Sequence, residues 1–251
     1  MARFSVNFYS YTLGHGVSIE VTIPSFSSCD RDPDKKWTHA LPAKFPVLYL
    51  LHGHGNDRFC WMRYTGVERL AEEQRIALVT LDTQNKAYNN LPNGDNYYDF
   101  LNEELPEFVK ANFPISDRPE DTYIAGLSMG GYGTLIHALG NPEKYCAFGA
   151  MSPGVSVIRE FGACIDPYEV VEAKVKEGCK LPAAYICCGK QDFLYDRVCD
   201  FVAKLEKLGV EHTWNAVDGY EHEWRYWDWE IGNFLKWIPR TDYYADKPHK
   251  I

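Results

Sequence analysis

The sequence has no surplus of basic residues, since 26 Lys and Arg stand against 35 Asp and Glu, for a formal net charge of -9. Surfaces for nucleic acid or anionic membrane need clustered positive charge, so neither partner is expected. No stretch approaches the roughly 20 apolar residues that a membrane span requires. The start of the chain lacks the basic and apolar regions of a secretory signal. We therefore expect a cytoplasmic protein that acts on a small molecule.

Metal and disulfide patterns are also missing. Eight cysteines are scattered without a framework, and neither a C-x-x-C pair nor an H-x-x-x-H spacing is present. Cys187 and Cys188 are adjacent in an apolar stretch that reads as a buried strand, which is poor geometry for a structural disulfide. We expect reduced thiols, no metal and no cofactor.

Apolar residues, in contrast, are plentiful. They make up 45% of the 251 residues, and aromatic residues make up 15%. A chain of this length and composition can bury a large core. We expect one α/β domain over residues 1–251, with a polar loop insertion at 25–44 and a tail at 240–251. The sequence leaves the oligomeric state open, and a homo-oligomer is one alternative.

The apolar pattern changes along the chain. Residues 4–8 and 17–23 alternate between apolar and polar, which is typical of antiparallel strands at a sheet edge. Further predicted strands follow, and the first of them, 45–53, is a continuous apolar run typical of a strand covered on both faces. Helical patterns alternate with them, which predicts a mostly parallel, doubly wound sheet. The predicted strands are at 45–53, 76–82, 122–126, 146–152, 181–189 and 212–217, and the helical patterns at 66–75, 95–113, 130–139, 196–209 and 223–238.

Two segments interrupt this alternation. Residues 25–44 are polar and of mixed charge, which predicts a solvated loop, with a recognition or oligomer contact as the alternative. The loop enters the first parallel strand at its N-terminal end, whereas ligands of such sheets bind at the C-terminal ends. Residues 153–180 hold one weak helical pattern and lie over the ligand end. A small flap and a plain crossover connection are equally good interpretations.

The sequence GLSMGG, residues 126–131, joins a predicted strand to a predicted helix. A sharp turn there exposes the oxygen of Ser128, and the flanking glycines remove side chains that would clash with nearby backbone. The backbone N–H of Met129 lies at the helix N-terminus, where it can stabilise an oxyanion. We therefore predict Ser128 as a nucleophile.

A serine hydroxyl needs a general base within hydrogen-bond reach. Among eight histidines, His222 fits best, because it lies between the last predicted strand and the last helix, on a loop at the catalytic end. His137 falls inside the helix after Ser128, where packing is the more common role.

The base needs an acid that fixes its tautomer. Asp192 directly follows a buried strand, and we favour it over Asp196, which suits the first turn of a helix. Asp218 and Glu221 are too close to the histidine along the chain. The chain order serine, aspartate, histidine is that of an α/β-hydrolase. We expect this fold with a small cap or none.

The second oxyanion donor of this fold comes from the loop after the first long parallel strand. That loop reads LLHGHGND here, and we expect the backbone N–H of His54 to be the donor; the alternative is a polar turn or metal site at His52 and His54. The aromatic residues Trp61, Tyr88 and Trp224 are candidates for lining a pocket, with core packing as the alternative.

Several of these stretches resemble the family of esterases that contains esterase D, most closely its bacterial tributyrin-esterase branch. The stretches are FPVLYLLHGHGND, WMRYTGVERLAEE, DTYIAGLSMGGYGTL, GKQDFLYD and GYEHEWRYWD. The resemblance implies a triad of Ser128, Asp192 and His222, with oxyanion amides from His54 and Met129. Residues 84–98 lack the longer segment typical of the family's S-formylglutathione hydrolases.

We therefore expect a serine carboxylesterase that hydrolyses short-chain acyl esters through an acyl-enzyme intermediate. The alternatives are a feruloyl or acetyl esterase acting on plant cell-wall (xylan) fragments, and an S-formylglutathione hydrolase. A non-catalytic hydrolase-fold binding protein is the alternative of a different class. Such proteins usually lose a member of the triad, whereas all three positions are filled here.

Overall fold

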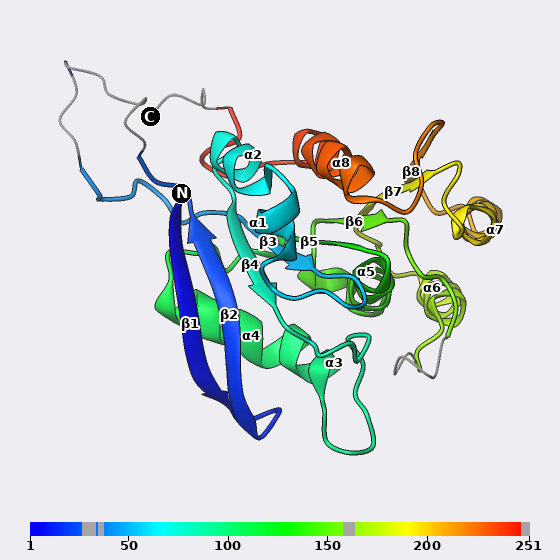
Figure 1. Ribbon diagram of the computed structural model, residues 1–251, viewed down its shortest axis with the longest axis horizontal. Helices are drawn as coiled ribbons and strands as arrows, with labels where there is room; N and C mark the ends of the chain where they lie inside the picture. Colours follow the sequence, from blue (N-terminus) through cyan, green and yellow to red (C-terminus); the bar gives the residue numbers. More distant parts are fainter. Residues whose placement is uncertain (27–33, 35–37, 158–163, 247–251) are drawn as a thin grey trace.

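The chain forms one eight-stranded sheet in the order β1-β2-β4-β3-β5-β6-β7-β8 (Figure 1). The computed structural model describes residues 1–26, 34, 38–157 and 164–246. β1 pairs antiparallel with β2, and β2 pairs antiparallel with β4, whereas every later pair is parallel. The strands are β1 (Ala2–Ser10), β2 (His15–Ile23), β3 (Val47–Leu51), β4 (Ala77–Leu81), β5 (Thr122–Leu127), β6 (Ala147–Met151), β7 (Ala183–Gly189) and β8 (His212–Val217).

Burial along the strands follows the apolar pattern of the sequence. Every residue of β3, β4, β5 and β6 is buried, because helices cover both faces of the parallel part of the sheet. Much of β1 is exposed, as befits an edge strand. The predicted mostly parallel sheet with antiparallel N-terminal strands is confirmed.

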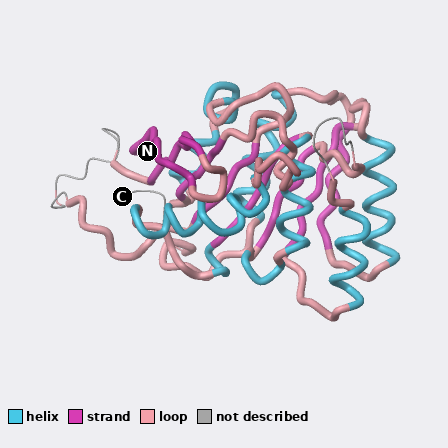
Figure 2. Tube along the Cα trace, turned by 90° about the horizontal axis from the view of Figure 1, so that it is seen from below, coloured by secondary structure: helices cyan, strands magenta, loops and turns pink. Residues whose placement is uncertain are grey.

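Helices form a layer on each face of the sheet (Figures 1 and 2). Side chains of α1, α2 and α8 share one apolar core with one face, and those of α3 to α7 share a second core with the other. The helices are α1 (Cys60–Tyr64), α2 (Val67–Glu73), α3 (Tyr97–Asp99), α4 (Leu105–Asn112), α5 (Met129–Gly140), α6 (Pro167–Lys176), α7 (Tyr195–Lys207) and α8 (Trp224–Trp237).

The helix predicted over 95–113 is divided. A π-helical turn, Phe100–Glu104, separates α3 from α4. The wider turn brings the Glu104 carboxylate to the bend after β1, where it accepts hydrogen bonds from the Ser10 hydroxyl and the Thr12 amide at 2.6 and 2.9 Å. Apolar periodicity carries no signal for such a change of pitch.

The segments that interrupt the alternation are described in part. Residues 27–33 and 35–37 of the 25–44 loop, and residues 158–163 of the 153–180 connection, lie outside the described residues, as do 247–251 of the tail. Residues 38–44 lead into the N-terminal end of β3. There the Tyr244 ring stacks on Phe45 at a centroid distance of 5.0 Å. The described part of the second segment contains α6, so a flap over the ligand end stays a prediction.

Among the described residues, no helix combines the length and apolar character needed to cross a bilayer.

Candidate active site

Ser128 lies on a strained turn between β5 and α5. Its φ of 56° and ψ of -115° fall outside the regions that L-residues prefer, at a cost of about 1–3 kcal/mol. Backbone bonds hold the turn, because the Ser128 N–H donates to Met151 at 3.0 Å and its carbonyl accepts from Tyr132 and Gly154 at 2.9 and 3.0 Å. This geometry aims the hydroxyl away from the sheet.

Close backbone contacts require the glycines around Ser128. A Cβ atom on Gly126 would lie 2.4 Å from the Gly130 oxygen, and one on Gly130 would lie 2.5 Å from the Leu51 oxygen. Because both obstacles are backbone atoms, neither can move aside. GLSMGG therefore carries glycine where the turn packs against itself and against the end of β3.

His222 lies between Ser128 and Asp192. The imidazole Nε2 is 3.0 Å from the Ser128 hydroxyl, and Nδ1 is 2.8 Å from an Asp192 carboxylate oxygen. A carboxylate only accepts, so we assign the ring proton to Nδ1, which leaves Nε2 free to accept from the hydroxyl. The three side chains come from the C-terminal ends of β5, β7 and β8, as the sequence predicted.

Asp192 is held in place as a carboxylate. Burial acts to raise its pKa, but hydrogen bonds from His222, the Leu194 amide and Ser152 outweigh burial and hold the pKa below the usual value of 3.8. The Leu194 amide donates at 2.9 Å. Asp196, the alternative acid, lies exposed in the first turn of α7.

Two supporting residues had no signal in the sequence. Ser152, just after β6, is fully buried and has a φ of 43°. Its hydroxyl accepts from the Trp227 indole N–H at 3.2 Å and bonds to Asp192. The Trp227 ring also meets His222 edge-on, with centroids 4.8 Å apart. A single Ser and one Trp of an aromatic-rich helix cannot be singled out by spacing.

The loop after β3 passes directly beside the nucleophile. A Cβ atom on Gly53 would lie 3.5 Å from the Ser128 Cβ and 2.6 Å from the Leu127 side chain. His54 follows at the exposed turn. Met129 is the first residue of α5, so its N–H has no acceptor within the helix. The two backbone segments predicted to supply oxyanion donors thus both lie next to Ser128.

A segment with several left-handed backbone residues packs against this loop. In residues 83–89, the clamp segment, the four residues Gln84, Asn85, Ala87 and Tyr88 have φ between 48° and 63° although none is glycine. Each such residue costs about 1–3 kcal/mol, so the surroundings must compensate.

Hydrogen bonds from the clamp segment reach the loop at several points. The Tyr88 hydroxyl donates to the His52 carbonyl at 2.8 Å, the Thr83 amide donates to His52 Nε2 at 3.1 Å, and Gly55 N–H donates to the Asn85 side chain at 2.7 Å. Burial lowers the pKa of His52, which matches an uncharged ring that accepts at Nε2. Both ring nitrogens of His52 therefore have hydrogen-bond partners within the protein, which indicates a structural role.

His137 holds the other side of the clamp segment. Its Nε2–H donates to the Tyr88 carbonyl at 3.0 Å, and its ring stacks on Tyr98 at 4.4 Å. Burial lowers the pKa of His137 to about 3. The expected packing role of His137 is confirmed by its complete burial.

The pocket prediction for Trp61 and Tyr88 is corrected. Both side chains have no exposed surface, because they pack in the core and bond to backbone at the end of β3. The Trp61 indole donates to the Leu51 carbonyl at 3.0 Å. Trp224 is partly exposed and stacks on Tyr64 at 4.8 Å, so it stays a candidate.

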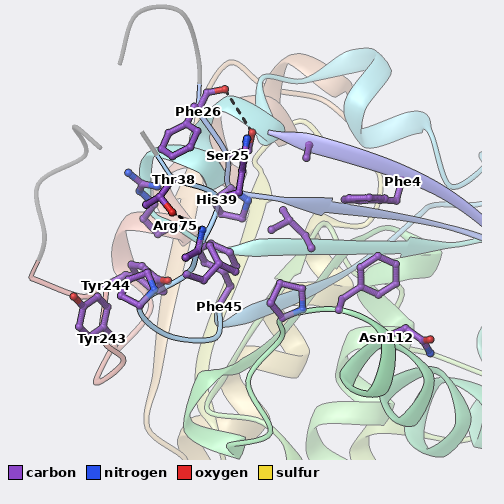
Figure 3. Close-up of a pocket in the computed structure, with 18 residues that line it drawn as sticks. Phe4, Ser25, Phe26, Thr38, His39, Phe45, Arg75, Asn112, Tyr243 and Tyr244 are labelled. Atoms are coloured by element: carbon purple, nitrogen blue, oxygen red, sulfur yellow. Dashed lines mark hydrogen bonds between the residues drawn. The ribbon is translucent and has the colours of Figure 1, made fainter. Parts of the chain in front are cut away.

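A large hollow among the described residues lies elsewhere (Figure 3). It has a volume of about 790 Å³ and is bounded by Phe45, Arg75 and Pro114, which precede β3, β4 and β5. Ser128, Asp192 and His222 follow their strands, so this hollow is at the opposite end of the sheet. It is not the site of the serine. Within the described part of the chain, no group of three or more His, Cys, Asp or Glu side chains is placed to hold a metal ion.

Several proteins similar to this chain in sequence and fold are named esterases or hydrolases. Residues 35–237 match the family described as "Putative esterase". An acetyl esterase of Caldicellulosiruptor saccharolyticus is 26% identical, over 96% of this chain and 99% of its own. Two solved Staphylococcus aureus structures are similar: the fluorophosphonate-binding serine hydrolase FphF, 30% identical with a TM-score of 0.83, and the S-formylglutathione hydrolase FrmB, 31% identical with a TM-score of 0.80.

These similarities extend over nearly the whole of each chain. FphF is matched over 96% of this chain and 99% of its own, and FrmB over 94% and 98%. The predicted relationship to esterases is confirmed. The chain therefore belongs to the "Putative esterase" family and is a carboxylic ester hydrolase with an α/β-hydrolase fold.

Proposed function

We propose that the chain is a serine carboxylesterase that uses Ser128, His222 and Asp192 to hydrolyse short-chain acyl esters. The observation that carries the proposal is the continuous pair of hydrogen bonds, 3.0 and 2.8 Å long, that joins the three side chains. A Ser hydroxyl is a weak nucleophile by itself, and an imidazole in this tautomer is the base that activates it.

The reaction proceeds in two halves. Ser128 Oγ bonds to the ester carbonyl carbon while its proton moves to His222 Nε2. The carbon–alkoxide bond then breaks, and His222 gives the proton to the departing alkoxide. In the second half, a water oxygen bonds to the acyl carbon while one water proton moves to His222 Nε2. The acyl–serine bond then breaks, and His222 returns the proton to Ser128 Oγ, which releases the acid and restores the serine.

The Asp192 carboxylate and two backbone amides support the charged intermediates. Asp192 stabilises the imidazolium and holds its orientation. The backbone N–H groups of His54 and Met129 donate to the carbonyl oxygen as it becomes negative. In a well-studied serine hydrolase, one such donor lowers the activation free energy by about 2.7–4 kcal/mol. Since these amides lie on a loop and a helix start that other contacts already fix, little reorganisation is needed.

The acyl preference is inferred from a relative. The protein matched over nearly the whole chain is named an acetyl esterase, which favours small acyl groups. The 31% identity to an S-formylglutathione hydrolase favours a second candidate, because a formyl thioester also carries a very small acyl group. A panel of acetyl, butyryl, octanoyl, feruloyl and S-formylglutathione substrates ranks these candidates. We expect acetyl and butyryl esters to lead.

The mechanism is tested with a set of single variants. Ser128→Ala and His222→Ala should each lower kcat for 4-nitrophenyl acetate by at least about 10⁴-fold. Asp192→Asn should cost about 10⁴-fold, because an amide N–H facing Nδ1 imposes the wrong tautomer. Asp196→Asn is the matched control and should keep full activity.

Circular dichroism and thermal unfolding of each variant check that the fold is intact. Full activity of either alanine variant rules out the mechanism. Loss of activity in Asp196→Asn, with activity retained in Asp192→Asn, would assign the acid to the other aspartate.

A further inference from the structure

Phe193 is an exposed aromatic residue beside the candidate base. Its side chain has 75% relative exposure, the largest among the large apolar residues identified as exposed. Single exposed apolar residues are ordinary on protein surfaces, so exposure alone indicates nothing. The Phe193 ring, however, lies against the His222 imidazole, with centroids 4.6 Å apart and planes at 51°.

The position of Phe193 is fixed by its neighbours. Asp192 on one side is buried against His222, and Leu194 on the other side is buried as well. The Asp192 N–H donates to the Gly189 carbonyl at 3.1 Å, and the Tyr195 N–H donates to the Asp192 carbonyl at 2.9 Å. Phe193 is therefore at the tip of a tight turn with both flanks anchored, which fixes the backbone from which the exposed ring projects.

The imidazole does not need Phe193 for its orientation. Asp192 bonds to Nδ1, and the buried Trp227 ring supports His222 edge-on from the core. Phe193 adds an apolar surface on the outer side. An exposed ring beside a base that is already held in place has its free face available to a substrate.

The chemistry of the proposed reaction says which part of the substrate is nearby. His222 Nε2 must deliver its proton to the oxygen of the leaving alcohol, so that oxygen lies within hydrogen-bond reach of Nε2. The carbonyl oxygen points instead to the backbone amides of His54 and Met129. The group carried by the leaving oxygen is thus the part of the substrate nearest the imidazole, and the exposed Phe193 ring contacts that imidazole.

We propose that Phe193 is a specificity residue for the alcohol part of the ester, and that it favours flat apolar alcohols such as aryl alcohols. The inference rests on the proposed function and extends it from the acyl group to the leaving group. Offset or edge-on contact between two aromatic rings is favourable beyond simple burial. Aliphatic alcohols of one or two carbons offer no ring for such a contact.

The proposal also predicts which half of the reaction Phe193 affects. The alcohol leaves when the acyl-enzyme forms, so Phe193 contacts the substrate only during acylation. Replacement of Phe193 should change acylation of an aryl ester while the hydrolysis rate of the acyl-enzyme stays as it is. A residue that merely held His222 in place would affect both halves and every ester alike.

The test compares 2-naphthyl acetate with methyl acetate, which share one acyl group. In Phe193→Ala, the ratio of kcat/KM for the naphthyl ester over the methyl ester should fall about 3- to 10-fold. Phe193→Leu, which keeps apolar bulk without a ring, should give an intermediate ratio. Tyr9→Ala is the matched control, since Tyr9 is 70% exposed on β1, and it should keep the wild-type ratio. Single-turnover measurement gives the acyl-enzyme hydrolysis rate.

An unchanged ratio in Phe193→Ala overturns the inference, and so does an equal fall for both esters together with slower acyl-enzyme hydrolysis, which would make Phe193 a positioning residue. Failure of the proposed function looks different. In that case the wild-type protein itself hydrolyses neither ester, and the inference falls with it.

Discussion

Two buried tyrosines, Tyr88 and Tyr49, should change the stability of the protein in opposite directions when each is replaced by Phe. The Tyr88 hydroxyl donates to the His52 carbonyl at 2.8 Å, whereas no hydrogen-bond partner of the Tyr49 hydroxyl is found among the described residues. Both side chains are at most 1% exposed and belong to the same apolar core. Replacement by Phe removes one oxygen in each case and leaves the ring in place.

The signs follow from the partners. Tyr88→Phe leaves a buried carbonyl without its donor, which should lower the free energy of unfolding by about 1–2 kcal/mol. Tyr49→Phe removes a buried polar group that lacks a bond, which should raise it by about 1 kcal/mol. At about 2–4 °C per kcal/mol for a chain of this size, Tm should fall by about 2–8 °C in the first variant and rise by about 2–4 °C in the second.

Urea unfolding followed by circular dichroism measures both changes. Because His52 precedes the loop beside Ser128, Tyr88→Phe should also lower kcat/KM for 4-nitrophenyl acetate several-fold, while Tyr49→Phe leaves it unchanged. Equal stability of the two variants, or a less stable Tyr49→Phe, would refute the assignment of these hydrogen bonds.

Two more predictions concern groups that support the site. Burial lowers the pKa of His137 in the folded chain to about 3. Between about pH 6 and 4 the unfolded chain therefore binds a proton at this residue that the folded chain does not bind. The free energy of unfolding should fall as the pH falls through this range. His137→Gln keeps a donor for the Tyr88 carbonyl, and its unfolding free energy should depend on pH less steeply, by up to about 1.4 kcal/mol per pH unit; an unchanged slope in urea titrations would contradict this. Ser152→Ala removes the acceptor of the Trp227 indole and a hydrogen bond to Asp192, so kcat/KM should fall by about tenfold or more, and wild-type kinetics in this variant would show that Asp192 needs no such support.

Much of the fold is predictable because one physical pattern governs it. Strands covered on both faces must be apolar throughout, which sets β3 to β7 apart from the alternating β1. The meeting of Ser128, Asp192 and His222 at one edge of the sheet was predictable for a related reason, since each follows a predicted strand, and parallel strands end at one edge of the sheet. Glycine marked the turn at Ser128, where a close approach of backbone demands it.

The supporting residues were not predictable in this way. Gln84, Asn85, Ala87 and Tyr88 adopt left-handed backbone without any glycine, so composition gives no warning of the clamp segment. Their conformation is imposed by tertiary hydrogen bonds, which local propensity cannot anticipate. The roles of Trp61 and Tyr88 could not be predicted either. A sequence does not distinguish an aromatic residue that lines a pocket from one that packs in the core.

The spacing of the site along the chain has a consequence for how the protein gains its activity. Ser128 and His222 are 94 residues apart, and β6 and β7 lie between their strands in the sheet. Contacts that distant in sequence form only after long loops close, which is slow compared with the formation of helices and the collapse of the core. Under the proposed mechanism, a chain still emerging from the ribosome holds Ser128 before it holds the base that activates it. Hydrolysis should then begin only when β8, the strand at the far edge, has joined the sheet.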